Sequence, residues 1–353
     1  MDKPDVHQGV RTVTGGFTLL EMMVATVIFV ILMLIIFQIT QTTSRVWRKS
    51  SSQITSMQGA RAAFESMTRR LSQATLNVYY GYDDPNNPSQ YLRRSELQFI
   101  CGKTLISNQI THAVFFQAPL GHTDDTNRYG YMENALNACG YYVVYGDDPN
   151  VPQFYKDAVN PPPKYRFRLM EYLQPTQNLG IYTPDNSISG NTLPGHGGGW
   201  IQPNSDNTRV LAENVVALII LPMRSTRDLG DVLNSDFEYD SRDGAWENGK
   251  PAQRYEHSSQ LPPIVQVTMV VIDEESAQKV CRDATKPNFG LDNLFQQVGN
   301  EQEQLLADLD TLKNTLGGKS GGNSIPLNYY VFQTNVAIRG AKWSSDLSSS
   351  SSQ

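Results

Sequence analysis

The feature that most constrains this chain is an apolar run close to its N-terminus. From Phe17 to Phe37 the sequence reads FTLLEMMVATVIFVILMLIIF, in which Glu21 carries the only charge. At about 1.5 Å per residue, a helix over this run is roughly 30 Å long, which matches the hydrocarbon core of a bilayer. The sequence therefore predicts a single transmembrane helix over residues 17–39.

The residues before this run indicate a removable leader on a retained anchor. A secretory signal has a shorter apolar core, and its small-residue cleavage site follows that core. Here Gly15 and Gly16 come before the apolar run, after a polar stretch that contains Lys3 and Arg11. We therefore expect residues 1–16 to form a polar leader that is removed, while the apolar helix stays in the membrane.

Glu21 is an unusual residue for such a segment. A carboxylate inside an apolar helix costs about 2.5–3.5 kcal/mol on membrane-insertion scales, so it normally has a partner or a function. Cleavage after Gly16 would leave a free ammonium at Phe17, about one helical turn from such a carboxylate. Two interpretations follow: Glu21 pairs with the amine of a neighbouring helix, or it reaches the lipid headgroups.

The string GG|FTLLEMMVATVIF resembles the class III signal sequences of type IV pilins and of the pseudopilins of type II secretion. This resemblance implies that a membrane prepilin peptidase/methyltransferase cuts between Gly16 and Phe17. It also implies methylation of the new N-terminal residue, Phe17. Glu21 would then be the carboxylate that guides assembly into a helical filament.

Charge and resemblance predict opposite orientations of the helix in the membrane. The far flank carries Arg45, Arg48 and Lys49, and the positive-inside rule places such a flank in the cytoplasm. The resemblance implies the opposite, with the leader inside and the remainder exported. We adopt the second orientation, which predicts a single-pass protein of the inner (cytoplasmic) membrane with its C-terminal domain in the periplasm or extracellular.

The helical pattern continues past the membrane segment. Six apolar residues recur at spacings of three and four, which forms one stripe along a helix. They are Ile54, Met57, Ala60, Phe64, Met67 and Leu71. Because neither Pro nor a loop cluster interrupts this region, we expect residues 40–77 to continue the helix to about Thr75, with the stripe packed on a sheet.

After residue 77 the chain changes to short apolar runs separated by turn residues, which is typical of β-strands. The predicted strands are 96–100, 111–118, 140–146, 165–173, 214–223, 261–273 and 328–340, and a helix is predicted over 299–316. In the strand at 165–173, Phe167 and Leu169 alternate with Arg166 and Arg168.

These elements define the expected fold. Residues 78–343 are predicted to form an exported, pilin-like β-rich domain with long loops at 183–207, 224–260 and 274–327. The Ser-rich tail, 344–353, is expected to be disordered. The fold class predicted is α+β, with the long N-terminal helix packed on antiparallel sheets.

The later strands add to the resemblance. LAENVVALIIL, LPPIVQVTMVVID and FQTNVAIRG, in that order, resemble the C-terminal half of J-type minor pseudopilins and W-type minor pilins. Prepilin-type proteins of similar length in the Verru_Chthon cassette protein C group are also similar. The resemblance implies assembly with other pseudopilins or minor pilins and with an inner-membrane assembly platform.

The segment DFEYDSRDGAWE is the strongest candidate for a metal site. Asp236, Glu238, Asp240 and Asp243 are spaced so that their oxygens could act as Ca²⁺ ligands from one loop. The helix–loop–helix calcium pattern fails, because Ser241 stands where that pattern requires Gly. Asp-rich segments are also good turn formers, so an ordinary solvated loop is the alternative.

The cysteines and histidines do not form a recognisable site. Cys101, Cys139 and Cys281 allow at most one intramolecular disulfide, in any of three pairings, or three buried thiols. The five histidines are His7, His112, His122, His196 and His257, which we expect in surface loops. Neither a Gly-x-Ser-x-Gly elbow nor a His-Glu-x-x-His helix is present in the sequence.

The predicted function is therefore structural. With a formal net charge of −6, the chain lacks the basic character that nucleic-acid binding requires. We expect a minor subunit of a type II secretion pseudopilus or a type IV pilus-like filament, with neither catalysis nor a cofactor. The alternatives are a membrane-anchored binding protein that uses the prepilin pathway for display, and an anchored hydrolase that uses an exported histidine.

Overall fold

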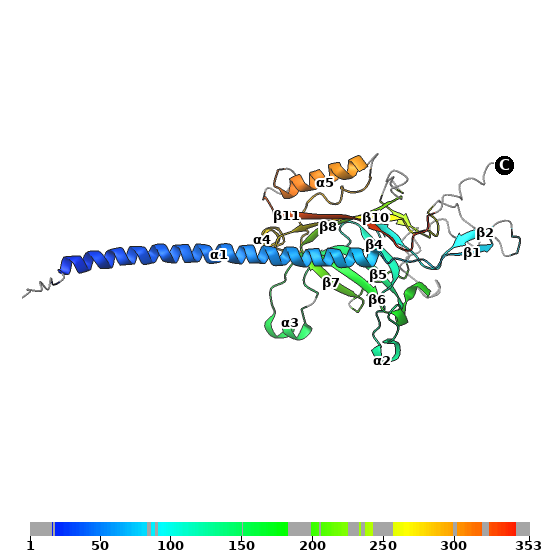
Figure 1. Cartoon of the computed structure of the whole chain (residues 1–353), viewed down its shortest axis with the longest axis horizontal. Coiled ribbons are helices and arrows are strands. Elements are labelled where there is room, and N and C mark those ends of the chain that lie inside the picture. The colour runs from blue at the N-terminus through cyan, green and yellow to red at the C-terminus, as the bar shows by residue number, and fades with distance from the viewer. Residues whose placement is uncertain are drawn as a thin grey trace, which may run out of the picture. The chain divides into compact units, whose positions relative to one another are not determined.

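The structure is a computed structural model, drawn in Figure 1. It describes residues 16, 18–82, 86–88, 91–149, 151–182, 199–204, 206–224, 233, 237–242, 257–298, 302–319 and 325–343. The chain divides into two compact units, residues 1–54 and 55–353, and each is described by itself. The fold is α+β, with a long apolar N-terminal helix and antiparallel sheets, as the sequence predicts. Most of the leader, Phe17, most of the loop at 183–207 and the tail 344–353 lie outside the described residues.

Helix α1 runs from Leu19 to Leu71, which is 53 residues. It ends about four residues before the predicted boundary, because the chain turns there to join a strand. The N–H of Gln73 donates to the carbonyl of Arg70, and the N–H of Ala74 donates to that of Leu71, both at 3.0 Å. The N–H of Thr75 then donates to the carbonyl of Gln117 at 2.9 Å, which takes this segment into the sheet.

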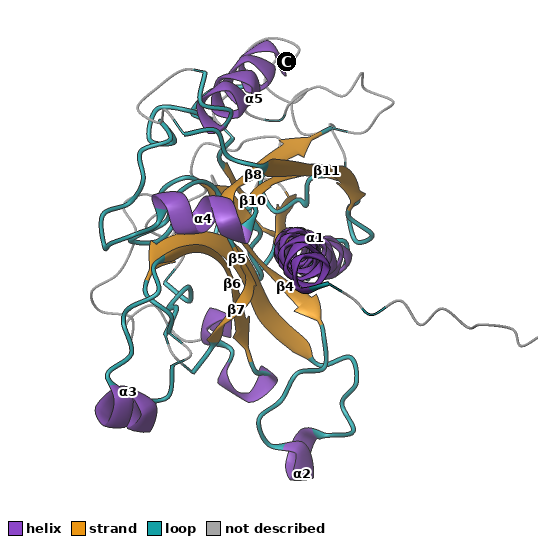
Figure 2. Cartoon of the chain, turned by 90° about the vertical axis from the view of Figure 1, so that its left-hand side faces the viewer, coloured by secondary structure: helices purple, strands orange, loops and turns teal. Residues whose placement is uncertain are grey.

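The second unit contains two main sheets and a separate hairpin. The larger sheet has the strand order β7-β6-β5-β4-β3-β9, the smaller one has the order β11-β10-β8, and β1 pairs with β2. Neighbouring strands are antiparallel throughout. Figure 2 shows the two main sheets as separate layers. The strands are β1 Tyr79–Tyr82, β2 Tyr91–Arg94, β3 Ile100–Gly102, β4 Ala113–Pro119, β5 Leu136–Gly146, β6 Arg166–Gln174, β7 Thr208–Glu213, β8 Val215–Met223, β9 Tyr239–Asp240, β10 Ile264–Ile272 and β11 Tyr329–Ala337.

Short helices lie in the connections between the strands. Helix α5 confirms the predicted helix at 299–316, whereas α4 begins directly after β10, inside a segment that the sequence assigns to a loop. Asp273 forms the N-cap of α4, because its side chain accepts a hydrogen bond from the N–H of Ser276 at 2.7 Å. The helices are α2 Thr126–Tyr129, α3 Gln153–Val159, α4 Glu274–Val280 and α5 Glu303–Leu316, with 3-10 turns at Thr176–Asn178 and Gly180–Tyr182.

The main core joins the last turns of α1 to both sheets. Ala60, Phe64, Met67 and Leu71, four of the six predicted stripe residues, are buried in it. The ring of Phe64 lies 5.7 Å from that of Phe332 in β11. The other two stripe residues are exposed, Ile54 by 54% and Met57 by 40%, so the packed part of the stripe begins at Ala60.

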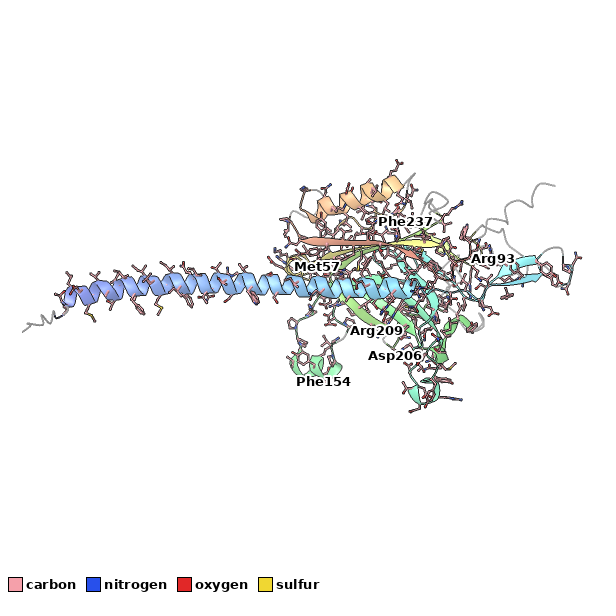
Figure 3. All side chains as sticks on the ribbon, in the orientation of Figure 1. Met57, Arg93, Phe154, Asp206, Arg209 and Phe237 are labelled. Carbon is pink, nitrogen blue, oxygen red and sulfur yellow. The ribbon has the colours of Figure 1, made fainter. Side chains whose placement is uncertain are left out.

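A buried carboxylate joins the end of α1 to the larger sheet. Glu171 in β6 is fully buried, and it accepts hydrogen bonds from Arg70 of α1 and from Arg209 of β7. Tyr141 of β5 donates its hydroxyl to the same carboxylate at 3.1 Å. Arg209 is labelled in Figure 3. Since removal of one partner would leave a buried charge unpaired, this cluster fixes where the helix meets the sheet.

The structure corrects one expectation about the strands and shows buried arginines in β6. Only Ile100 of the predicted strand 96–100 is in β3. The backbone N–H groups of the two residues before it pair with side chains and not with the backbone of a neighbouring strand. The N–H of Gln98 donates to Gln117 Oε1, and the N–H of Phe99 donates to Ser241 Oγ. In β6, the two arginines that alternate with Phe167 and Leu169 are both buried, and Arg168 is only 1% exposed. Its guanidinium donates to the carbonyls of Gly146 and Asp147, at 2.6 and 2.9 Å.

Candidate functional site: the apolar N-terminal helix

The first part of α1 is apolar on all sides and is exposed. Leu19–Trp47 has a mean hydropathy of 2.9 in its most apolar window, none of which is buried, and it is long enough to cross a membrane. Even the least exposed large side chain of Leu19–Ile39, that of Ile35, is 48% exposed. Figure 3 shows the side chains projecting on both sides of the ribbon. A helix that is apolar all round is stable only when lipid or other helices cover it.

Glu21 lies in the first turn of this helix, where it forms a capping box with Thr18. Glu21 Oε2 accepts hydrogen bonds from the backbone N–H of Thr18 at 3.0 Å and from its hydroxyl at 3.1 Å. In return, the N–H of Glu21 donates to Thr18 Oγ1 at 3.2 Å. This is the reciprocal arrangement of a Thr-x-x-Glu helix start, which satisfies backbone donors that the helix leaves unpaired.

The capping box adds a third interpretation of Glu21 to the two that the sequence analysis gives. A carboxylate at a helix N-terminus is stabilised by its hydrogen bonds and by the helix dipole, so it costs less in an apolar setting than an isolated charge. Sequence reasoning missed this role, although the string TLLE at 18–21 carries the signal. No residue that the structure describes donates to Glu21 Oε1.

Of the predicted cleavage residues, Gly16 is described and Phe17 lies outside the described residues. Gly16 is exposed, and a Cβ added to it would meet nothing within 4 Å. The conformation of this chain therefore does not itself require glycine at position 16. Gly16, Thr18 and Glu21 lie close together at the start of the helix.

Two of the histidines are not surface-loop residues, which corrects that prediction. His112 is 1% exposed and His257 is 9% exposed. The Nδ1 of His112 accepts a hydrogen bond from the N–H of Ile220 in β8 at 3.1 Å, and its Nε2 lies 2.9 Å from the carbonyl of Phe295. His112 therefore closes the free side of β8, a structural role. His122 is partly exposed, and its Nε2 lies 3.8 Å from Asp124 Oδ1. His7 and His196 are outside the described residues.

The position of His112 makes stability depend on pH. Burial lowers the pKa of His112 to about 4, from 6.5. Between these values the unfolded chain binds more protons, so the stabilisation is complete above pH 6.5 and is lost as the pH falls toward 4. We expect His112 to account for a loss on the order of 3 kcal/mol in the free energy of unfolding over that window.

The measurement is urea unfolding at several pH values for the wild type and for His112→Gln, whose amide offers one acceptor and one donor. Other groups titrate in the same window, so the difference between the two proteins is the quantity of interest. The variant should show the shallower pH dependence. Parallel curves would show that His112 does not titrate in this way.

The calcium candidates are only partly described. Asp236 and Asp243 lie outside the described residues, and the described residues contain no group of three or more potential ligands. Asp240 is 2% exposed, and its carboxylate accepts hydrogen bonds from Gln98 Nε2, at 2.8 and 2.9 Å, and from the N–H of Arg242 at 2.8 Å. Asp240 thus supports the β3–β9 edge, and Glu238 stays an untested candidate.

None of the three cysteines is in a disulfide, and all three are buried. Burial raises the pKa of Cys139 to about 12 and that of Cys281 to about 11. Of the alternatives that the sequence leaves open, the structure contains three buried thiols. Because the thiolate is the reactive form, the thiols of Cys139 and Cys281 react slowly at neutral pH.

Comparison of the chain with known protein families, with curated proteins and with solved structures finds no match.

Proposed function

We propose that this protein is a prepilin-type structural subunit, resembling J-type minor pseudopilins and W-type minor pilins, of a type II secretion or type IV pilus-like filament. The observation that carries the proposal is the start of α1. There a Gly-Phe pair precedes the exposed helix Leu19–Trp47, in which Glu21, the carboxylate of the capping box, is the only charged residue before Arg45. The helix provides a membrane anchor before assembly and a contact surface for other subunits after it.

The second unit supports the proposal by the way its sheets are built onto α1. Ala60, Phe64, Met67 and Leu71 pack into the main core, and Arg70 pairs with the buried Glu171. The end of the helix is therefore an integral part of the β-rich unit. In the proposed orientation, this unit lies in the periplasm or extracellular space, and the helix crosses the inner membrane once.

Processing gives the most direct test. Wild-type protein should begin at Phe17 and carry one added methyl group, whereas Gly16→Val should keep its leader. Because a Cβ at position 16 meets nothing within 4 Å, a failure of Gly16→Val to be cut would come from the peptidase and not from misfolding of this chain. The measurement is the intact mass of protein isolated from membranes.

The matched control is Glu21→Leu, which keeps Gly16 and Phe17 and should be cut normally. An intact leader on the wild-type protein, in cells that contain a prepilin peptidase, would contradict the proposal. Normal cleavage of Gly16→Val would show that the cut lies elsewhere.

The hairpin of β1 and β2 favours a second candidate function, display of a binding surface. Tyr80, Tyr82 and Tyr91 share one face of this hairpin by their register, and they are exposed by 68%, 48% and 63%. Tyrosine is a common contact residue in binding surfaces. The two functions differ in their partners: a filament subunit must co-purify with other prepilin-type proteins through α1, and a display protein need not.

A further inference from the structure

We propose that Arg45, Trp47, Arg48 and Lys49 form a collar on α1 that binds the headgroups of anionic phospholipids in the leaflet on the exported side. The inference rests on the proposed function, because it requires that α1 cross a membrane. It goes beyond that function by assigning a ligand class to a segment outside the apolar run.

The spacing along the helix places the collar at the depth of the lipid phosphates. Leu19–Ile39 contains 21 residues, so at about 1.5 Å per residue it spans roughly 30 Å, the thickness of the hydrocarbon core. The next five residues, 40–44, read TQTTS and carry only hydroxyl or amide side chains. They add about 7 Å, close to the thickness of one headgroup layer, so the collar begins where the phosphates lie.

The sequence of α1 around the collar contains no carboxylate. Between Glu21 and Glu65 the sequence contains no carboxylate. The collar begins about 24 residues after Glu21 and ends about 16 residues before Glu65. At about 1.5 Å per residue, both carboxylates are more than about 20 Å away along α1. The sequence of segment 45–49 therefore has a net charge of +3, which complements the negative charge of anionic headgroups.

The aromatic member of the collar points to a lipid ligand. Trp47 is 76% exposed, although it is the largest apolar side chain of the first unit. Tryptophan concentrates at the membrane–water interface, where its ring lies among headgroups. Arg45 and Trp47 are both exposed beside this layer of hydroxyl and amide side chains. An exposed cation, an exposed indole and two further cations in the sequence together fit an anionic phospholipid surface at headgroup depth. The side chains of Arg48 and Lys49 lie outside the described residues.

The collar also accounts for the charge pattern that opposes the proposed orientation. By the positive-inside rule, these cations belong on the cytoplasmic side. If these cations bind anionic headgroups, that binding explains why they lie on the exported side. Each Lys or Arg near an anionic surface contributes about fivefold in affinity.

The test uses the full mature chain in phosphatidylcholine vesicles, with either brominated phosphatidylcholine or brominated phosphatidylglycerol as the quencher of tryptophan fluorescence. Trp47→Phe identifies the part of the quenching that comes from Trp47. In the wild type we expect brominated phosphatidylglycerol to bind beside Trp47 at least about fivefold more strongly than brominated phosphatidylcholine, and less so at high salt. With Arg45→Gln, Arg48→Gln and Lys49→Gln combined, this ratio should fall to about one.

The matched control is Arg69→Gln, which removes an exposed cation from the same helix about 20 residues beyond the collar and should leave the ratio unchanged. Equal quenching by both lipids in the wild type, or a preference that survives the triple substitution, would overturn the collar and leave the proposed function intact. If neither lipid quenches Trp47, α1 is not in the bilayer, and both proposals fail.

Discussion

Val267→Asp should unfold the β-rich unit. Val267 is fully buried in β10, the central strand of the smaller sheet, between Ile220 of β8 and Thr334 of β11. A carboxyl group there must be buried charged or take up a proton, and either costs about 4 kcal/mol or more. Since domains are typically stable by only about 5–15 kcal/mol, most or all of the stability would be lost.

The measurement uses a fragment that begins at residue 45, which lacks the apolar run and should be a soluble monomer. Circular dichroism and urea unfolding report its β content and stability. Val331→Asp is the matched control, because Val331 lies in the edge strand β11 and is 37% exposed. It should cost about 1 kcal/mol or less. An insoluble wild-type fragment without β structure, or equal losses in both variants, would contradict the description of this unit.

Strands β8, β10 and β11 are the part of the fold that sequence predicts well. The runs that became β8 and β10 are apolar and buried, whereas β11 alternates between exposed residues and residues that are at least partly buried. Turn residues bound all three, so period and length identify them. The hairpin β1–β2 was missed, because Tyr79–Tyr82 is short and mostly exposed and is followed by residues that favour turns. β9, with two residues, is defined by its pairing with β3 and by no local pattern.

Buried polar residues are the part that sequence cannot supply. His112 is held by Ile220 and Phe295, which are 108 and 183 residues away along the chain. Nothing near His112 in the sequence distinguishes a buried histidine from one in a surface loop. The capping box differs in this respect, since Thr18 and Glu21 are three residues apart and the motif is visible in the sequence.

Glu21 should be required for assembly but not for cleavage or insertion. We expect Glu21→Leu to be cut after Gly16 and inserted normally, and to lose at least about tenfold in cross-links to other prepilin-type proteins. If Glu21 pairs with the ammonium of Phe17 on a neighbouring subunit, its loss leaves that amine unpaired in a low dielectric, at a cost of several kcal/mol. The helix also loses the one charge that marks axial register on an apolar surface.

Because Glu21 also caps α1, the Glu21→Leu variant removes both the cap and the charge. Two further variants separate these two roles. Glu21→Gln keeps a capping-box acceptor at this position but removes the charge. Thr18→Val removes the hydroxyl of the box but keeps the carboxylate. If the charge carries assembly, Glu21→Gln should fail like Glu21→Leu. If only the cap matters, Glu21→Gln should behave like the wild type, and Thr18→Val should be the weaker variant.

The cross-links are measured in cells with a photoreactive p-benzoylphenylalanine in place of Ile28, which is 52% exposed on the apolar helix. Cysteine-based probes along residues 24–36 are a second route, since Cys101, Cys139 and Cys281 are buried and need not be replaced. Each variant is compared at equal amounts of cleaved, membrane-inserted protein, so a defect in processing cannot pass for a defect in assembly. Wild-type levels of cross-linking in Glu21→Gln would show that an intersubunit ion pair is not what holds the helices in register. Glu21 would then be a helix cap that the membrane tolerates.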